Sequence, residues 1–145
     1  MKKIFLYLFS ISIFCNVALA QSSLPECEAS PLIIKKFSVT GGNTAAKLKL
    51  MKWNSCYGTL VKKNGSQYVG EFESGKFSGQ GTYTYNDGTV YEGSFFEGRS
   101  DGYGTMKYSN GDTYVGEFAR GKISGLGKYT FYGGGFDYGM WEKVN

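Results

Sequence analysis

The chain has 145 residues and a formal net charge of +4, and this length is typical of a single domain. Loss of Lys2 and Lys3 with an N-terminal leader would lower the charge to +2 (4 − 2). Domains that bind nucleic acid usually present a strongly basic face. So small a net charge argues against a nucleic-acid partner.

The first 20 residues have the pattern of a secretory signal peptide. Lys2 and Lys3 precede an apolar run over residues 4–14, and Ala18-Leu19-Ala20 supplies the small residues of a cleavage site. The apolar run is short for a membrane span, although an uncleaved N-terminal anchor is the alternative. We expect cleavage after Ala20 and export of residues 21–145 to the periplasm or the medium.

Two cysteines, Cys27 and Cys56, remain after this cleavage. Exported chains with an even number of cysteines usually pair them. Two free thiols or half of a metal site are the alternatives, but the sequence has no His, so a zinc site would lack its usual ligands. We expect a Cys27–Cys56 disulfide that stabilises the fold by roughly 3–4 kcal/mol, and we expect no metal and no cofactor.

The segment that follows the predicted cleavage site is rich in lysine. Residues 21–67 carry seven Lys against Glu26 and Glu28, a local charge of +5. Much of this charge lies in an insert, residues 35–52, between the two cysteines. Such a run is usually a solvated surface, and contact with an anionic surface is the alternative. A short helix around residues 45–52 is one interpretation of this insert.

Residues 68–136 repeat with a period of 23 residues. The segments YVGEF, YEGSF and YVGEF begin at Tyr68, Tyr91 and Tyr114. Glycine and aromatic residues recur in fixed columns after each start. These columns are Gly70/Gly93/Gly116, Phe72/Phe95/Phe118, Gly75/Gly98/Gly121, Gly79/Gly102/Gly125 and Gly81/Gly104/Gly127. A fixed period of this length indicates a repeat architecture.

Within each repeat the residues alternate with a period of two, which is typical of β-strands. Connections such as Ser74-Gly75-Lys76 and Asn86-Asp87-Gly88 have the residues of hairpin turns. The sequence therefore predicts an all-β fold, a single-layer antiparallel sheet of consecutive β-hairpins that is curved and open-ended. Glycine weakens a strand, so we expect Tyr and Phe rings to lie over the bare backbone at Gly70, Gly79 and Gly81.

The pattern YxGxF…GxxxGxG resembles the MORN repeat and covers residues 68–90, 91–113 and 114–136. A half-repeat over residues 56–67 precedes these units, with Cys56-Tyr57-Gly58 in the place of Gly79-Gln80-Gly81. A partial repeat over residues 137–145 follows, in which Gly139 and Trp141 are in register with Gly116 and Phe118. The repeat domain is thus predicted to span residues 56–145.

The entry segment also resembles that of small secreted bacterial MORN-repeat proteins. The residues that carry this resemblance are Leu24, Pro25, Cys27, Trp53, Asn54, Cys56 and Gly58. Repeat stacks need capped ends. We therefore expect residues 21–55 to cap one edge and residues 137–145, with Trp141, to close the other. The resemblance implies a non-enzymatic module that binds proteins or membranes.

The sequence offers little that supports catalysis. The lack of His excludes Ser-His-Asp and Cys-His arrangements. The Gly-x-Gly steps fall within predicted strands, whereas a dinucleotide-binding loop must open a helix. Glu71 and Glu117 are predicted on one face, two strands apart, and a hydrolase that uses such surface carboxylates is the remote alternative. We expect that the protein is not an enzyme.

Two sets of residues are candidates for binding. Tyr57, Tyr68, Tyr91 and Tyr114 either form the core or line an open trough that stacks against a peptide, helix or sugar. Lys76, Arg99 and Lys122 occupy the same connection of each repeat, so they are predicted to form a row along one edge. This row either suits an exposed turn or meets anionic lipid or acidic glycan, with about 1 kcal/mol per charge.

These patterns predict a non-enzymatic, exported binding or scaffold protein that contacts an unidentified protein partner at the cell envelope. Peripheral binding to anionic phospholipid is the alternative. Repeat sheets can also pair end to end, so a dimer is a further prediction.

Overall fold

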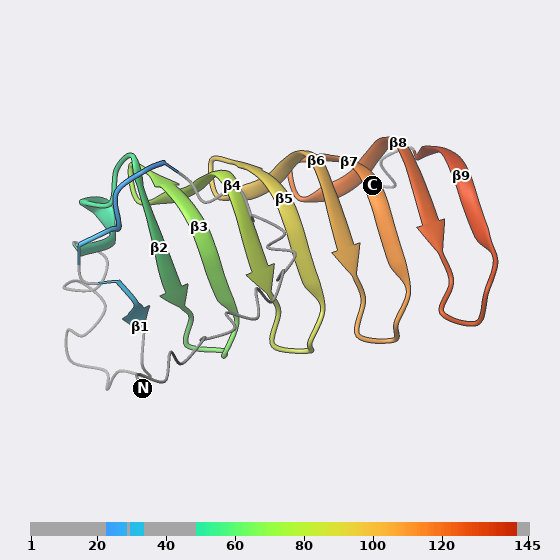
Figure 1. Ribbon diagram of the computed structural model, residues 1–145, viewed down its shortest axis with the longest axis horizontal. Coiled ribbons are helices and arrows are strands. Elements are labelled where there is room, and N and C mark those ends of the chain that lie inside the picture. Colours follow the sequence, from blue (N-terminus) through green and yellow to red (C-terminus); the bar gives the residue numbers. More distant parts are fainter. Residues whose placement is uncertain (1–22, 29, 34–48, 142–145) are drawn as a thin grey trace, which may run out of the picture.

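The computed structural model describes residues 23–28, 30–33 and 49–141. Nine strands in these ranges form one sheet, and their spatial order is their chain order (Figure 1). They are β1 (Leu32–Ile33), β2 (Cys56–Val61), β3 (Gln67–Glu73), β4 (Lys76–Thr84), β5 (Val90–Phe96), β6 (Arg99–Lys107), β7 (Thr113–Ala119), β8 (Lys122–Thr130) and β9 (Phe136–Trp141). Strands β2 to β9 pair antiparallel and β1 pairs parallel to β2. The predicted all-β sheet of consecutive hairpins is confirmed.

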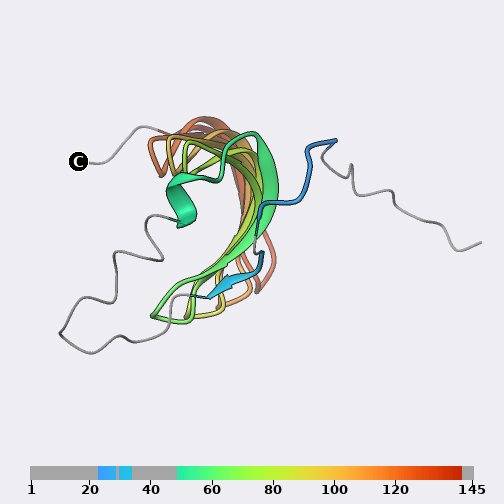
Figure 2. The same cartoon turned by 90° about the vertical axis from the view of Figure 1, so that its left-hand side faces the viewer.

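The sheet is a single curved layer. In the end-on view it forms a C-shaped section, and a short helical turn at residues 49–51 lies on its concave side (Figure 2). Part of the helix predicted around residues 45–52 is therefore present. The predicted leader and most of the Lys-rich insert lie outside the described residues. Within the described part of the chain, no helix has the length and apolar character needed to cross a membrane.

Two kinds of turn alternate along the sheet. The turns after β3, β5 and β7 have two residues, and both adopt positive φ, as at Ser74 (50°) and Gly75 (72°). This geometry suits the twist of paired strands, and glycine adopts it without strain at the second position. The longer turn at residues 85–89 closes through Tyr85 N–H donating to Thr89 O (2.8 Å). The predicted turn residues therefore occupy the turns.

A ladder of glycines crosses the middle of the sheet. In every antiparallel pair one glycine lies opposite another: Gly58–Gly70, Gly70–Gly81, Gly81–Gly93, Gly93–Gly104, Gly104–Gly116, Gly116–Gly127 and Gly127–Gly139. Gly58 of β2 and Gly139 of β9 continue the ladder on either side of residues 68–136. Side chains alternate across a sheet, so these glycines share a face with Tyr68, Tyr91 and Tyr114. We call this the ring face and the opposite one the outer face.

The tyrosine rings fill the space that the glycines leave. A Cβ atom added at Gly104 would lie 2.5–2.7 Å from three atoms of the Tyr91 side chain. Tyr68 covers Gly70 and Gly81 in the same way, and Tyr114 covers Gly116 and Gly127. The prediction that rings lie over Gly70 and Gly81 is therefore confirmed.

Gly79 is an exception, and the prediction there is wrong. Its φ is +55°, in an irregular stretch where two residues of β4 lack partners on β3, and the atoms nearest an added Cβ belong to the Glu71 carboxylate. The same arrangement recurs at Gly125 with Glu117. Positive φ redirects the Cβ position toward the outer face, so this glycine serves the bend of the strand rather than a ring.

The core is a chain of aromatic contacts from one repeat to the next. Tyr68 meets Phe95 with ring centroids 4.9 Å apart, and Tyr91 meets Phe118 at 4.8 Å, both edge to face. Such pairs contribute about 0.5–1.5 kcal/mol beyond the area they bury. Trp141 takes the place of the next Phe, at 5.8 Å from Tyr114. Trp141 thus packs on the last tyrosine of the core, and residues 142–145 of the predicted cap lie outside the described residues.

The N-terminal segment caps the first edge of the sheet, and it makes the same hydrogen bonds to the first repeat that each hairpin makes to the next one. Gly98 and Gly121 each donate their turn N–H to a carbonyl of the preceding hairpin, Phe77 O and Ser100 O, and Gly75 donates to Trp53 O (2.7 Å). Asn54 Oδ1 accepts from Ser74 N–H, as Asp101 Oδ2 accepts from Arg120 N–H. Trp53 and Asn54 thus supply the contacts that a preceding hairpin would make.

The glycine ladder yields a direct test. We expect Gly104→Ala to lower the free energy of unfolding by about 1–3 kcal/mol, because the new methyl group overlaps the Tyr91 ring. Gly139→Ala is the matched control, because no atom lies within 4 Å of its added Cβ. It should change stability by less than about 0.5 kcal/mol. Equilibrium denaturation of both variants measures the difference, and equal losses would contradict the packing described.

Candidate functional site

Three of the four candidate tyrosines lie in the core. Tyr68, Tyr91 and Tyr114 are 0% exposed. Each hydroxyl donates to a backbone carbonyl three residues on, as from Tyr91 to Ser94 O (2.9 Å). Of the two interpretations of these residues, the structure supports the core. Their rings hold neighbouring strands together and leave no face for stacking on a ligand.

Tyr57 lies apart from these three. Gly58 pairs with Gly70, so the side chain of Tyr57 points to the outer face, opposite Glu71 of β3. The prediction grouped Tyr57 with the three trough tyrosines. The correction follows from the alternation of side chains along a strand.

The basic row is present but partly neutralised. Lys76, Arg99 and Lys122 open β4, β6 and β8, each directly after a two-residue turn. Lys76 Nζ lies 3.4 Å from Glu97 Oε1 of the next turn, with side chains 56% and 66% exposed. An exposed pair of this kind contributes little to stability. The pair does, however, neutralise the positive charge of Lys76 at the β4 end of the row.

The sequence analysis missed one cation of this edge. Arg120 is the first residue of the turn between β7 and β8, with φ 52°, and its N–H donates to Asp101 Oδ2 (3.0 Å). It occupies the position that Ser74 and Glu97 hold in the earlier turns. Positive charge therefore gathers toward the C-terminal end of the row, at Arg99, Arg120 and Lys122. Comparison of that column across the repeats would have revealed it.

Glu71 and Glu117 share the outer face but are not neighbours. They lie on β3 and β7, four strands apart rather than the predicted two. Strands in a sheet are about 4.8 Å apart, so the two carboxylates are separated by about 19 Å. Paired carboxylates in glycoside hydrolysis are no more than about 9.5 Å apart. The pair therefore lacks the spacing of a two-carboxylate active site.

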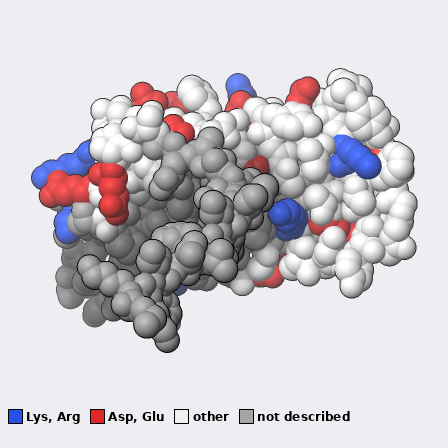
Figure 3. Space-filling model, in the orientation of Figure 1, with Lys and Arg blue, Asp and Glu red and all other residues white. Residues whose placement is uncertain are grey.

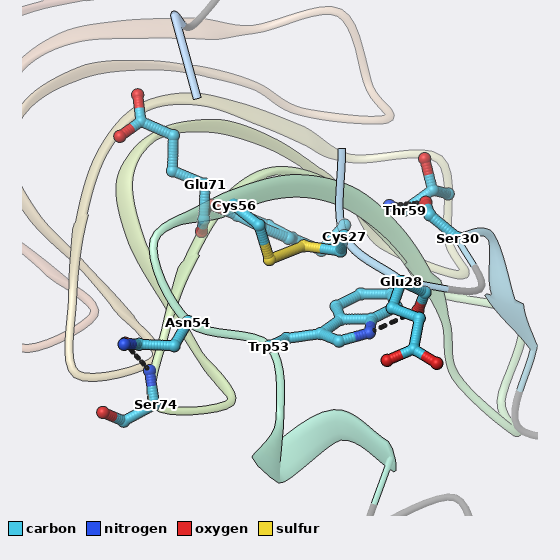
Figure 4. The surroundings of a disulfide bond; sticks show 10 residues. Cys27, Glu28, Ser30, Trp53, Asn54, Cys56, Thr59, Glu71 and Ser74 are labelled. Atoms are coloured by element: carbon cyan, nitrogen blue, oxygen red, sulfur yellow. Dashed lines mark hydrogen bonds between the residues drawn. A yellow bond between two sulfur atoms is a disulfide. The ribbon is translucent and has the colours of Figure 1, made fainter. Parts of the chain in front are cut away.

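The predicted disulfide joins Cys27 to Cys56, with Cα atoms 5.0 Å apart. The Trp53 ring lies beside it, and its Nε1–H donates to Glu28 O at 2.8 Å (Figure 4). On the other side of the segment Thr59 N–H donates to Ser30 Oγ at 2.9 Å. The disulfide and these bonds fix residues 25–28 and 30–33 along the edge of β2. In the described residues no group of three His, Cys, Asp or Glu side chains is placed to hold a metal ion.

A patch of exposed apolar side chains lies on the outer face of the C-terminal strands. It consists of Tyr103 (63% exposed), Leu126 (41%), Phe136 (60%), Tyr138 (64%) and Met140 (75%), and we call it the outer patch. Leu126 and Met140 are register partners on β8 and β9. Lys128 Nζ lies 4.2 Å from the centre of the Phe136 ring. This end of the molecule shows mostly uncharged residues in Figure 3.

The outer patch was not predicted from the sequence. The equivalent position of the three repeats holds Gln80, Tyr103 and Leu126. The first of these residues is polar, and the period-two alternation predicted polar residues on this face. Single exposed apolar residues are ordinary on protein surfaces. Leu126, Phe136, Tyr138 and Met140 lie on the two neighbouring strands β8 and β9, whereas Glu117 of β7 lies between Tyr103 and Leu126. A group of exposed apolar residues beside charged ones is typical of a contact surface. The change from Gln80 to Tyr103 to Leu126 at this position of the repeat is the feature of the sequence that could have predicted the patch.

Comparison with family models identifies the repeat unit. Residues 68–90, 91–113 and 114–136 each match the model of the MORN repeat. Residues 68–136 therefore resemble three tandem MORN repeats. The matched bounds are those predicted from the Tyr columns, and each MORN repeat here comprises a hairpin (β3–β4, β5–β6 or β7–β8) with its two turns. The search of curated proteins found no significant match.

The MORN tyrosines predict how the fold responds to alkali. Burial, with the nearby charge of Asp101, raises the pKa of Tyr91 to about 12 from an ordinary value of 10.0. The unfolded chain therefore loses this proton first as pH rises above 10, so folding stability falls between pH 10 and 12. Below pH 10 the contribution is fully present. We expect Tyr91→Phe to reduce the steepness of this fall.

The measurement is the free energy of unfolding at several values between pH 9 and pH 12. Tyr132→Phe is the control, because the Tyr132 side chain is 81% exposed. The slope for Tyr91→Phe should differ from the wild type by up to one proton, and the control should match the wild type. A Tyr91→Phe slope equal to that of the wild type would show that this hydroxyl is not shielded from solvent.

Proposed function

We propose that the protein is a non-enzymatic binding or scaffold protein that acts at the cell envelope by contacting another protein. The observation that carries this proposal is the outer patch. The ring face is occupied by the core and by the helical turn, so the outer face offers the larger surface. Four of its five residues, two Tyr, Phe and Met, are of types enriched in protein interfaces.

Two further features support export. The N-terminal sequence has the pattern of a leader with a cleavage site after Ala20. The Cys27–Cys56 disulfide suits an oxidising compartment. The cap depends on this bond, because it holds residues 25–28 and 30–33 against β2. A chain retained in a reducing compartment would lose that link.

The proposal predicts a specific loss of binding. We expect Tyr103→Ser combined with Leu126→Ser to weaken capture of the envelope partner at least about tenfold, which corresponds to about 1.4 kcal/mol. Phe96→Ser is the matched control, because Phe96 is also 63% exposed on the outer face but lies outside the patch. The measurement is affinity capture from envelope extract, quantified by mass spectrometry.

Three results have distinct meanings. A protein retained by the wild type and by Phe96→Ser, and lost by the double variant, is the expected result. Equal retention by all three chains would contradict the assignment of the patch. Absence of any protein retained above the level of a blank matrix would contradict the proposed function itself.

A second candidate is peripheral binding to an anionic membrane, and the gathering of Arg99, Arg120 and Lys122 at one edge favours it. Each cation contributes about 1 kcal/mol near an anionic surface. This candidate predicts salt-sensitive co-sedimentation with vesicles that contain phosphatidylglycerol, lost in Arg99→Glu/Arg120→Glu. No pelleting at low salt would reject it. Retention on an acidic polysaccharide matrix but not on vesicles would indicate a glycan instead.

A further inference from the structure

A shallow cleft crosses the outer face in the N-terminal half of the sheet. Its volume of about 630 Å³ lies within the range of about 300–1,000 Å³ that is typical of ligand-binding pockets. The ladder glycines Gly81, Gly93 and Gly104 lie along its floor, between two rows of outer-face side chains. The cleft therefore crosses strands β2 to β6 and follows the long axis of the sheet (Figure 1).

Tyrosines border this cleft at its two ends. Tyr57 lies on β2, the first strand of the cleft, and Tyr103 lies on β6, the last one, with 63% of its side chain exposed. Four strand spacings of about 4.8 Å separate the two residues by about 19 Å. A tyrosine ring has a large apolar body for stacking and a polar tip. The separation is too large for one small ligand, and it suits an extended ligand with flat apolar faces near both ends.

Hydrogen-bonding side chains line the cleft between the tyrosines. They are Glu71, Gln80, Thr82, Glu92 and Thr105. Within the described part of the chain, neither Glu71 nor Glu92 has an ion-pair partner or a side-chain hydrogen bond. Gln80 Nε2 donates to Ser94 Oγ (3.0 Å), which leaves the amide oxygen free to accept. Ionised carboxylates only accept hydrogen bonds, so the cleft favours a ligand that is rich in O–H donors.

The backbone of the cleft is not available to a ligand. Strands β3 to β6 each pair with a strand on both sides, so most of their N–H and C=O groups already take part in the sheet. Sheets that bind extended peptides usually do so at an unpaired edge, through main-chain hydrogen bonds. The lining residues Glu71, Glu92 and Lys107 carry a local charge of −1 (1 − 2), which disfavours an anionic ligand. Both a peptide strand and an acidic polymer therefore fit this cleft poorly.

A neutral β-1,4-linked oligosaccharide has the required form. Its pyranose rings present flat C–H faces that stack on aromatic rings, and its hydroxyl groups donate hydrogen bonds at the edges of each sugar. The chain is extended, and alternate sugars turn the same face to one side. It advances by about one strand spacing, roughly 5 Å, per sugar, so the first and fifth sugars are about 20 Å apart. This length matches the separation of Tyr57 and Tyr103.

We propose that the cleft binds a neutral β-1,4-linked oligosaccharide of about five sugars, a length set by the strand spacing. The terminal sugars stack on Tyr57 and Tyr103, and the sugars between them donate hydrogen bonds to Glu71 and Glu92. This site goes beyond the proposed function, because it takes a different class of ligand and lies on other strands than most of the outer patch. Tyr103 borders both surfaces, so the test uses Tyr57 and the two carboxylates.

Isothermal titration calorimetry on the full-length chain purified after export tests the site. The probes are cellopentaose and its N-acetylated counterpart chitopentaose, which show whether the site accepts acetamido groups. We expect a Kd below about 1 mM for at least one of them, and binding at least about tenfold weaker for the corresponding disaccharide. The disaccharide is too short to reach both tyrosines.

Two variants remove separate parts of the site. Tyr57→Ala removes one stacking ring, and Glu71→Gln/Glu92→Gln keeps the side-chain shapes but removes the charged acceptors. Each should weaken binding of the pentasaccharide at least about tenfold. Phe96→Ala is the matched control, because Phe96 is an exposed ring of the same face that does not line the cleft. It should bind like the wild type, and circular dichroism checks that all the variants are folded.

Three results would overturn the proposal. The first is the absence of binding to both pentasaccharides, and the second is equal affinity for the pentasaccharide and the disaccharide. The third is binding of a pentalysine peptide, lost in Glu71→Gln/Glu92→Gln, with no binding of sugar, which would assign the cleft to a cationic peptide. Capture of an envelope protein by the outer patch should be unchanged in Tyr57→Ala, so this proposal and the proposed function fail separately.

Discussion

The fit of a tyrosine ring over two facing glycines is the contact on which the rest of this structure depends. One layer of sheet has no second layer to bury its side chains, so each repeat must make its core from its own strands. The glycines remove the side chains that would lie beneath the ring, and the ring then seals the backbone against water. Tyr91 over Gly93 and Gly104 shows the unit complete, with the hydroxyl bonded to Ser94 O. A repeat period of 23 residues is the spacing that returns this unit every second strand.

This constraint also decides which surfaces are left for function. Because the ring face is used for folding, contacts with other molecules fall to the outer face and the edges. The N-terminal edge is used by a cap in which Trp53 and Asn54 reproduce the contacts of a missing hairpin. The outer face changes along the MORN repeats from Gln80 to Tyr103 to Leu126, so its apolar character grows toward β9. Binding of a protein partner is therefore expected at the C-terminal half, away from the cap.

Much of the fold was predictable from the sequence, because aligning the three repeats shows which residues occupy equivalent positions. The hairpins, the turn residues, the Gly–Gly columns and the roles of Cys56 and Trp141 all follow from aligning three units. The errors occurred where position depends on a local irregularity. Gly79 was assigned to a ring although the bend in β4 turns it toward Glu71. Tyr57 was placed on the wrong face, and the outer patch was missed because its column does not repeat one residue type.

The central claim is that each ladder glycine beneath a tyrosine is required by that ring, and a double-mutant cycle tests this most directly. The three atoms closest to a Cβ at Gly104 all belong to Tyr91. Gly104→Ala should therefore be costly in the wild type and nearly neutral when combined with Tyr91→Ala. Denaturation of the two single variants and the double variant should give a coupling free energy of about 1–3 kcal/mol. Additive losses would contradict the account, because the glycine would then be needed for a reason other than the ring.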